Sequence, residues 1–258
     1  MLCLIPRYLP TLLLGAARLA HALTIPSAAS SSASSGDASS SRNDTAGGIF
    51  KRSASYNWCG PVNFGSGITS VEATWAVPKV SLPRGGWPSH DYHFYQWVGL
   101  DGTKGCGALL QGGTGQTIEN GHVSYYTWFE FWPSPPVYGH VEISPGDTVH
   151  VRVNATSAES GRIYFENKST RERYTEVVKS SGASLCFATA EWIGENPSIP
   201  PGQFPAFSQY DFTGCRAQTS SGAVLGLPGA DDWIMFRGEE RLCHPERRGD
   251  LTTSIIYG

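Results

Sequence analysis

The sequence predicts an all-β protein, an antiparallel sandwich or barrel, and three observations support this fold class. Apolar residues alternate with polar ones at every second position, and no segment keeps a helical period for three turns. The 30 Gly and 17 Pro provide many turns between short strands. Short strands joined by such turns are typical of sandwiches and barrels, and the absence of a repeat of fixed period excludes a solenoid.

The clearest strands lie in the middle of the chain. Three valines alternate with polar residues over 149–153, just after the turn Ser-Pro-Gly-Asp at 144–147, and 141–143 lead into that turn. This pattern predicts a hairpin with one buried face. A second hairpin is expected where 163–165 and 174–178 flank a polar turn.

The first 52 residues differ in composition from the rest. Residues 1–22 combine Arg7, an apolar stretch and the small-residue site Ala20-His21-Ala22, which is typical of a secretory signal peptide. Residues 23–52 are rich in Ser, Ala and Gly, cannot bury a core, and end in Lys51-Arg52. We expect a prosegment removed after Arg52, with an uncleaved flexible tail as the alternative. Residues 53–258 are then one secreted, β-rich domain.

Composition also limits the partners. The domain after Arg52 has more acidic than basic residues and no basic stripe with interleaved aromatics, so nucleic acid is not an expected partner. No later stretch is apolar enough for a membrane span, and we expect a monomer without membrane contact.

Common hydrolase signatures are missing from the sequence. It contains neither a Gly-x-Ser-x-Gly elbow nor a His-Glu-x-x-His zinc motif. The run Asp101-Gly102-Thr103 has the wrong order for an aspartic peptidase. His90 and His93 lie close to Asp91, but a loop explains them better than a metal site, so we expect no metal and no cofactor.

Five separated motifs, in order, carry a resemblance. They are Trp97–Gly102, Cys106, Leu109–Gly113, Trp128–Pro133, and Cys186 followed by Glu191-Trp192-Ile193. This pattern resembles the glutamic peptidases (eqolisins) of filamentous fungi over residues 56–212. The resemblance implies a two-sheet, concanavalin-like β-sandwich. It also implies an endopeptidase that hydrolyses polypeptides in acid without a cofactor.

The resemblance places two catalytic residues, Gln111 and Glu191. Taken alone, each has an ordinary explanation, a hydrogen-bonded strand glutamine and a solvent-facing carboxylate. In the family's pattern Gln111 orients the attacking water and donates hydrogen bonds to the oxyanion. Glu191 becomes the general base, which later protonates the leaving amine. A glutamate near its reference pKa of about 4.3 can do this only in acid, and burial or a nearby carboxylate adjusts that pKa.

The same transfer places Trp97, Asp101, Trp128 and Glu130 around the catalytic pair. The two tryptophans are expected to line the substrate groove, although large aromatics also fill sandwich cores. Asp101 could equally be a turn residue before Gly102.

Cysteines and glycosylation patterns fit a secreted protein. Cys106 and Cys186 each lie five residues before a catalytic candidate, and a disulfide between them would tether the two strands. Of Cys59, Cys215 and Cys243, at most two can form a further bridge, and the sequence does not say which. Asn43, Asn154 and Asn167 are candidate glycosylation sites.

Two points stay open at this level. From about residue 237 the chain departs from the long alternating strands with which the family ends, and a missing final strand would expose a sheet edge. In addition, a β-sandwich glycosidase using Glu130 and Glu191, or a carbohydrate-binding protein stacking sugars on Trp, remain alternatives. The glycosidase reading leaves Gln111 without a role.

Overall fold

The computed structural model describes residues 51–103, 105–197 and 203–258. The predicted signal peptide, most of the predicted prosegment and Asn43 lie outside these residues. All regular elements in the described part are strands. They are β1 (Lys51–Ser55), β2 (Trp58–Phe64), β3 (Ile68–Ala76), β4 (Val80–Ser81), β5 (Tyr92–Asp101), β6 (Leu109–Glu119), β7 (His122–Trp132), β8 (Val137–Tyr138), β9 (Thr148–Ser157), β10 (Ser160–Asn167), β11 (Glu172–Lys179), β12 (Thr189–Glu195), β13 (Ala206–Phe207), β14 (Tyr210–Thr219), β15 (Val224–Leu225), β16 (Asp231–Arg237), β17 (Glu240–Gly249) and β18 (Thr252–Tyr257). Over the same ranges the protein has no helix that is long and apolar enough to cross a membrane.

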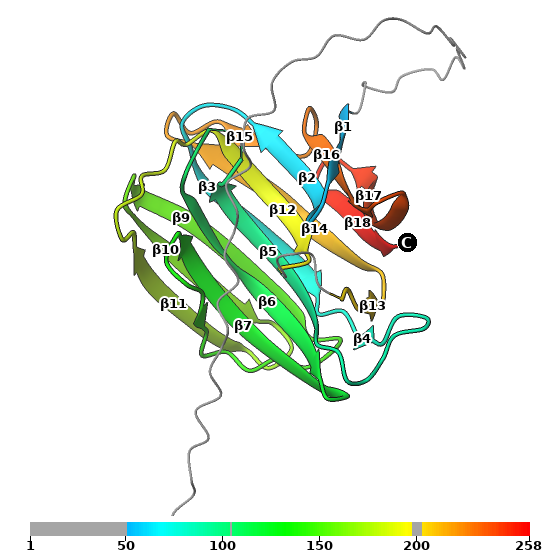
Figure 1. The fold of residues 1–258 in the computed structure, drawn as a ribbon. Helices are drawn as coiled ribbons and strands as arrows, with labels where there is room; N and C mark the ends of the chain where they lie inside the picture. Colours follow the sequence, from blue (N-terminus) through cyan, green and yellow to red (C-terminus); the bar gives the residue numbers. More distant parts are fainter. Residues whose placement is uncertain (1–50, 104, 198–202) are drawn as a thin grey trace, which may run out of the picture.

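The strands form two packed layers (Figure 1). One layer runs β8-β7-β6-β5-β12-β2-β16, and the other runs β11-β10-β9-β3-β14-β18-β17. The hydrogen-bonded path folds over at β16 to β18, where β17 and β18 also contact β2. The pairs within this path are antiparallel, which confirms the predicted sandwich.

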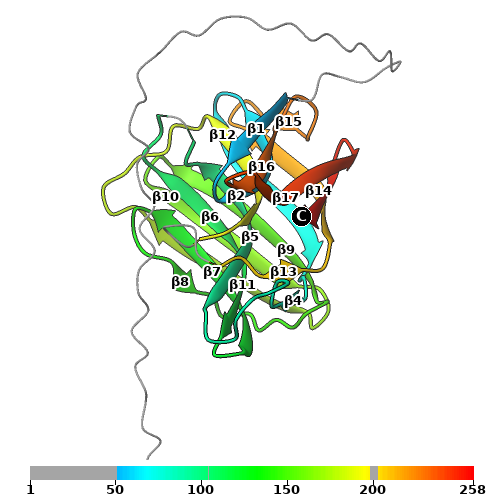
Figure 2. The same ribbon diagram turned by 45° about the vertical axis from the view of Figure 1, so that its right-hand side comes forward.

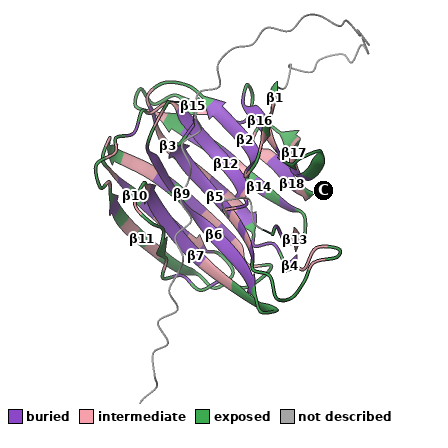
Figure 3. Cartoon of the chain, in the orientation of Figure 1, coloured by how far each residue is buried: buried purple, intermediate pink, exposed green. Residues whose placement is uncertain are grey.

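The core lies between the layers, where strands from each are buried in their middle sections (Figure 3). Leu110 of β6 and Trp192 of β12 meet Val151 and Phe165 of the second layer in one apolar cluster. Because side chains alternate along a strand, residues adjacent to Leu110 and Trp192 in sequence project to the outer face of their layer. Gln111 and Glu191 are two of these residues.

One predicted hairpin is confirmed and the other is wrong. β10 and β11 pair antiparallel around the polar turn, as expected. The strand at 148–157 is also present, but it pairs with β3 and β10, and 141–143 form no strand. The turn at 144–147 is instead bonded to the chain after β3, through Val77 N to Asp147 O (2.9 Å) and Gly146 N to Val77 O (2.8 Å). The buried alternation at 141–143 therefore reflects core packing rather than a strand.

The C-terminal segment completes the sheet. β17 pairs with β16, and β18 lies between β17 and β14, so residues 240–257 join the two layers. The strands β1, β16 and β17 lie at the same end of the molecule (Figure 2). There a disulfide links Cys59 of β2 to Cys243 of β17, with the two Cα atoms 5.9 Å apart. Cys215 is buried and forms no disulfide with the described residues.

Candidate active site

The outer face of the first layer carries a row of polar side chains on four neighbouring strands. Glu191 of β12 lies opposite Gly99 of β5, Gly99 opposite Gln111 of β6, and Gln111 opposite Glu130 of β7. Directly paired residues project to the same face of a sheet. Since neighbouring strands are about 4.8 Å apart, the backbones of Glu191 and Gln111 are about 10 Å apart, with only a glycine between them.

Gly99 makes room for neighbouring side chains at the point in the row between Glu191 and Gln111. A Cβ atom at this position would lie 2.8 Å from Cζ3 of Trp97 and 3.1 Å from Cδ1 of Leu109. These contacts are closer than a side chain tolerates without displacing its neighbours. The sequence motif Trp-Val-Gly thus has a physical reason, because only a glycine fits under the Trp97 ring at this point of the row.

Gln111 is held by Glu130. The Gln111 amide nitrogen donates to Glu130 Oε2 at 2.5 Å, and both residues are buried. The pKa of Glu130 is raised to about 8. Burial is the largest cause and the charge of Glu195 adds to it, while the hydrogen bond from Gln111 partly opposes the rise. Within the described residues Gln111 Oε1 has no partner. A separation of 2.5 Å is typical of O–H···O bonds, and the oxygen and nitrogen of an amide exchange places by a 180° rotation. A protonated Glu130 can therefore donate to the amide oxygen and free both amide N–H groups.

Glu191 is the most deeply buried of the polar side chains in this row. Its residue is 0% exposed, and neither carboxylate oxygen makes a hydrogen bond of good geometry with the described residues. Burial raises its pKa well above the usual value; the nearby Thr189 hydroxyl lowers it, and the charge of Asp101 raises it further.

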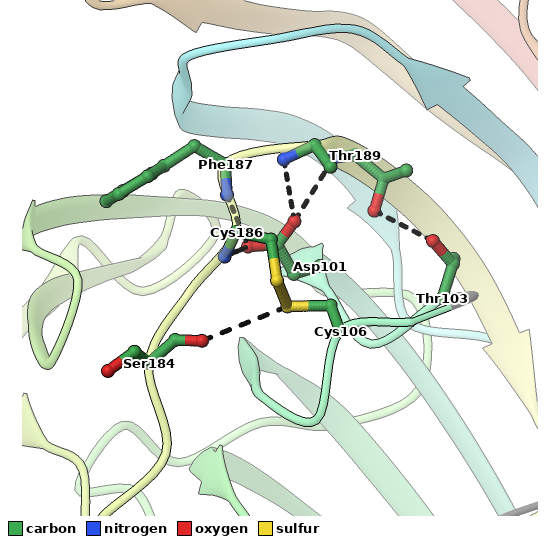
Figure 4. Close-up of a disulfide and its surroundings, with 8 residues drawn as sticks. Asp101, Thr103, Cys106, Ser184, Cys186, Phe187 and Thr189 are labelled. Carbon is green, nitrogen blue, oxygen red and sulfur yellow. Dashed lines mark hydrogen bonds between the residues drawn. A yellow bond between two sulfur atoms is a disulfide. The ribbon is translucent and has the colours of Figure 1, made fainter.

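Asp101 supports the entry to β12 (Figure 4). Its carboxylate accepts four backbone N–H groups, from Cys186 (2.7 Å), Phe187 (2.8 Å), Ala188 (2.8 Å) and Thr189 (3.2 Å). It adopts a left-handed conformation, φ 72°, at the end of β5. These bonds fix the segment that leads into Glu191, so the structure places Asp101 beneath the site as an anchor.

The predicted disulfide between Cys106 and Cys186 is present and lies beside Asp101 (Figure 4). It ties the loop before β6 to the segment before β12, and so tethers the strands that carry Gln111 and Glu191. Asp101 and these two cysteines are the one cluster of potential metal ligands found in the described part of the chain. The two sulfurs are bonded to each other, so they cannot act as thiolate ligands.

Comparison with known proteins assigns the family. Residues 56–257 match the model of the peptidase A4 family. The chain belongs to this family. It is 33% identical to Aspergillopepsin-2 of Aspergillus niger, with 77% of each chain covered, and 32% identical to Scytalidopepsin B of Scytalidium lignicola, with 67% of each covered.

Solved structures of glutamic peptidases have the same fold. A scytalido-glutamic peptidase with a transition-state analogue inhibitor matches with a TM-score of 0.69 at 30% identity, covering 79% of this chain and 98% of that one. Aspergilloglutamic peptidase from Aspergillus niger matches with a TM-score of 0.60 at 29% identity, covering 65% and 99%. The chain is therefore a glutamic-type endopeptidase with polypeptide substrates. The family match also extends through the divergent C-terminal segment.

Tryptophans cover the polar row of this glutamic peptidase. Trp97 and Trp128 are buried and lie on either side of Gly113, one step along the strands from the Gly99–Gln111 pair. They form a second apolar cluster with Trp58, Val62, Leu109 and Ile193, against which Tyr95, Tyr126, Trp132 and Trp233 pack. The sequence analysis assigned no role to Trp58 or Trp233. The sequence offers only weak signals for them, an aromatic segment at 56–58 for Trp58 and an isolated Trp next to apolar residues for Trp233.

Glu195 is a further site residue that the sequence analysis missed. It lies four residues after Glu191 on the same strand, and the period of two places both on one face. Its carboxylate accepts from Trp97 Nε1 at 2.7 Å, Trp58 Nε1 at 3.2 Å and Asn57 Nδ2 at 3.3 Å.

The two glycosylation candidates within the described residues differ in their surroundings. Asn167 is fully buried, its amide nitrogen donates to Glu142 O (3.0 Å) and Asp147 Oδ2 (2.9 Å), and its amide oxygen accepts from two backbone N–H groups. This structural role argues against a glycan at Asn167. Asn154 is half-buried on β9, and its glycosylation stays a prediction.

Proposed function

We propose that this peptidase is a secreted acid endopeptidase in which Gln111 and Glu191 act together on one peptide bond. The observation that carries the proposal is their placement in one row, with Gly99 between them. With backbones about 10 Å apart, the ends of two long side chains can reach the same water molecule and the same carbonyl group. The proposed secretion rests on the signal-peptide pattern at 1–22.

The proposed reaction uses the two side chains in different ways. Ionised Glu191 takes a proton from the water that attacks the scissile carbonyl. The amide N–H groups of Gln111 donate to the oxyanion of the tetrahedral intermediate, a contribution of about 3 kcal/mol in comparable sites. Glu191 then gives its proton to the leaving amine, and the C–N bond breaks. Neutral Gln111 exchanges no proton at any step.

Glu130 acts as a positioning residue for Gln111. Because its pKa is raised to about 8, it is protonated in acid and can donate to the amide oxygen of Gln111. This orientation turns both amide N–H groups toward the substrate. Because its pKa is raised well above the usual value, only a fraction of Glu191 is ionised in acid, and in that fraction the carboxylate is a stronger base than that of an ordinary glutamate.

The geometry does not favour the glycosidase alternative. Glu130 and Glu191 are three strands apart, which corresponds to about 14 Å between their backbones. Glycosidase carboxyl groups lie about 5 to 9.5 Å apart, with nothing but substrate or water between them. Here Gln111 stands between the two carboxyls. A purely carbohydrate-binding role would leave the buried, unpaired Glu191 unexplained.

A direct assay tests the proposal. The purified chain beginning at Ser53 should cleave a denatured protein at about pH 4, with pepstatin present to exclude aspartic peptidases. Gln111→Ala and Glu191→Gln should each abolish this cleavage. Release of reducing sugar, or full peptidase activity in either variant, would contradict the proposal.

A further inference from the structure

The side chain of Trp97 spans the space between Glu195 and the polar row. Its Nε1 atom donates to Glu195 Oε2 at 2.7 Å. At its other end, ring atoms Cζ3 and Cε3 lie 2.8 and 3.1 Å from where a Cβ of Gly99 would be. The six-membered ring therefore covers Gly99, at the point in the row between Glu191 and Gln111. Rotating the indole by 180° about its bond to Cβ would break the hydrogen bond and move this ring edge.

Trp58 is held by the same carboxylate. Glu195 on β12 lies opposite Trp58 on β2 and opposite Tyr95 on β5. The indole Nε1 of Trp58 donates to Oε1 of Glu195. The rings of Trp58 and Trp97 meet edge to face, with centroids 4.9 Å apart. One carboxyl group thus fixes two neighbouring indoles, and the rest of the aromatic cluster packs on them.

We propose that Glu195 is a positioning residue, which sets the orientation of Trp97 and so shapes the space between Gln111 and Glu191. This inference rests on the proposed roles of those two residues. Glu195 itself makes no contact with the reacting atoms, because Ile193 separates it from Glu191 along β12. Four residues of a strand correspond to about 13 Å.

The protonation state of Glu195 gives the inference a sharp test. Glu195 is partly exposed, but its carboxylate lies among the indoles. Burial raises the pKa of Glu195 to about 7, although its three hydrogen bonds act to lower it. Tyr95 on β5 and Glu130 on β7 are the titratable groups whose pKa values its charge raises. In acid Glu195 is therefore neutral. A glutamine at this position has nearly the same shape, and its single amide oxygen can accept from Trp97 Nε1, whereas its NH2 group cannot accept from Trp58 Nε1.

The experiment compares three substitutions with a control in an acid assay that uses a quenched peptide. Glu195→Ala should lower kcat/KM by on the order of 100-fold, because the Trp97 ring loses its fixed orientation. Glu195→Gln should keep most of the wild-type activity, and Trp97→Phe, which removes the N–H donor, should reproduce the loss. Glu172→Ala, at an exposed strand end of the other layer, should have no effect. Because Glu195 acts through Trp97, the double mutant Glu195→Ala/Trp97→Phe should be no worse than either single mutant.

Three results would overturn the inference. Equal activity in Glu195→Ala and Glu172→Ala would show that Glu195 has no positioning role. A fully inactive but folded Glu195→Gln would point to proton transfer by Glu195 itself. If the Glu195→Ala variant does not fold, the inference is overturned by a Trp97→Phe variant that keeps the activity of the wild type.

Near-UV circular dichroism reports the indole geometry independently of turnover and should change in Glu195→Ala but not in Glu195→Gln. Retained activity in Gln111→Ala or Glu191→Gln would instead contradict the proposed function.

Discussion

Removing the amide of Gln111 and the carboxyl of Glu191, singly and together, should show whether they serve one transition state. Loss of one oxyanion donor typically costs about 3 to 4 kcal/mol, or a factor of about 100 to 1,000 in kcat. Loss of the base in Glu191→Gln should cost at least as much. Because each side chain needs the other, the double mutant should be little worse than the more damaged single mutant.

The effects on stability separate catalysis from unfolding. Gln111 makes one side-chain hydrogen bond, to Glu130, so Gln111→Ala leaves a buried carboxyl unpaired at a cost of about 1 to 3 kcal/mol. Glu191 has no well-formed hydrogen bond to lose within the described residues, and its charged form is destabilised by burial. Glu191→Gln should therefore retain or raise the unfolding temperature near neutral pH while abolishing turnover.

The assay is turnover of a quenched peptide in acid, with thermal unfolding measured on the same samples. Glu130→Gln is the informative companion, because the glutamine can still donate to the Gln111 amide oxygen and should keep substantial activity. The reasoning is refuted if Gln111→Ala turns over within about tenfold of the wild type, or if effects of the two single mutants multiply in the double mutant.

Three further predictions concern the pH dependence of stability, the glycine at position 99 and the processing of the N-terminal segment. Glu130, Glu191 and Glu195 bind protons more tightly when folded, so the free energy of unfolding should fall as pH rises from about 4.5 through about 8, and a flat unfolding temperature over this range would contradict it. Gly99→Ala should reduce activity by at least about tenfold, since its Cβ displaces Trp97 or Leu109; wild-type kinetics would show that the position of these two side chains does not matter for catalysis. Lys51→Ala/Arg52→Ala should yield a longer, less active secreted form, and N-terminal sequencing that finds residue 23 on fully active enzyme would exclude processing after Arg52.

The sequence predicted the parts of the structure that depend on local pattern. Alternation with a period of two identified the hairpin of β10 and β11, and the spacing before Gln111 and Glu191 identified the Cys106–Cys186 bridge. The prediction failed at 141–143, because alternation reports burial on one face and does not show whether a backbone has a partner strand. There the backbone of the following turn is bonded to Val77.

Other features depend on contacts between distant segments. The Cys59–Cys243 bridge joins residues 184 positions apart, and only the order β17-β16-β2 brings them together. Asn167 matched a glycosylation pattern, yet its amide is used to hold the turn at 144–147. The spacing of four residues from Glu191 places Glu195 on the same face of the strand, but its proposed role depends on where the Trp97 ring lies. The spacing of residues in the sequence does not show that position.

The polar row carries a stability cost that its surroundings offset. A buried carboxyl that has no well-formed hydrogen bond to the described residues, as at Glu191, is unfavourable, and this segment of β12 would be a weak point of the sheet. Both ends of the strand are reinforced. Four N–H bonds to Asp101 and the Cys106–Cys186 bridge hold its start, while the bonds of Glu195 to two indoles hold its end. Hydrogen bonds to a charged carboxylate, as at Asp101, each contribute about 1.5 to 3 kcal/mol, and those to the neutral carboxyl of Glu195 about 0.5 to 1.5 kcal/mol. Together these contacts can keep Glu191 in place while its oxygens stay available to a substrate water.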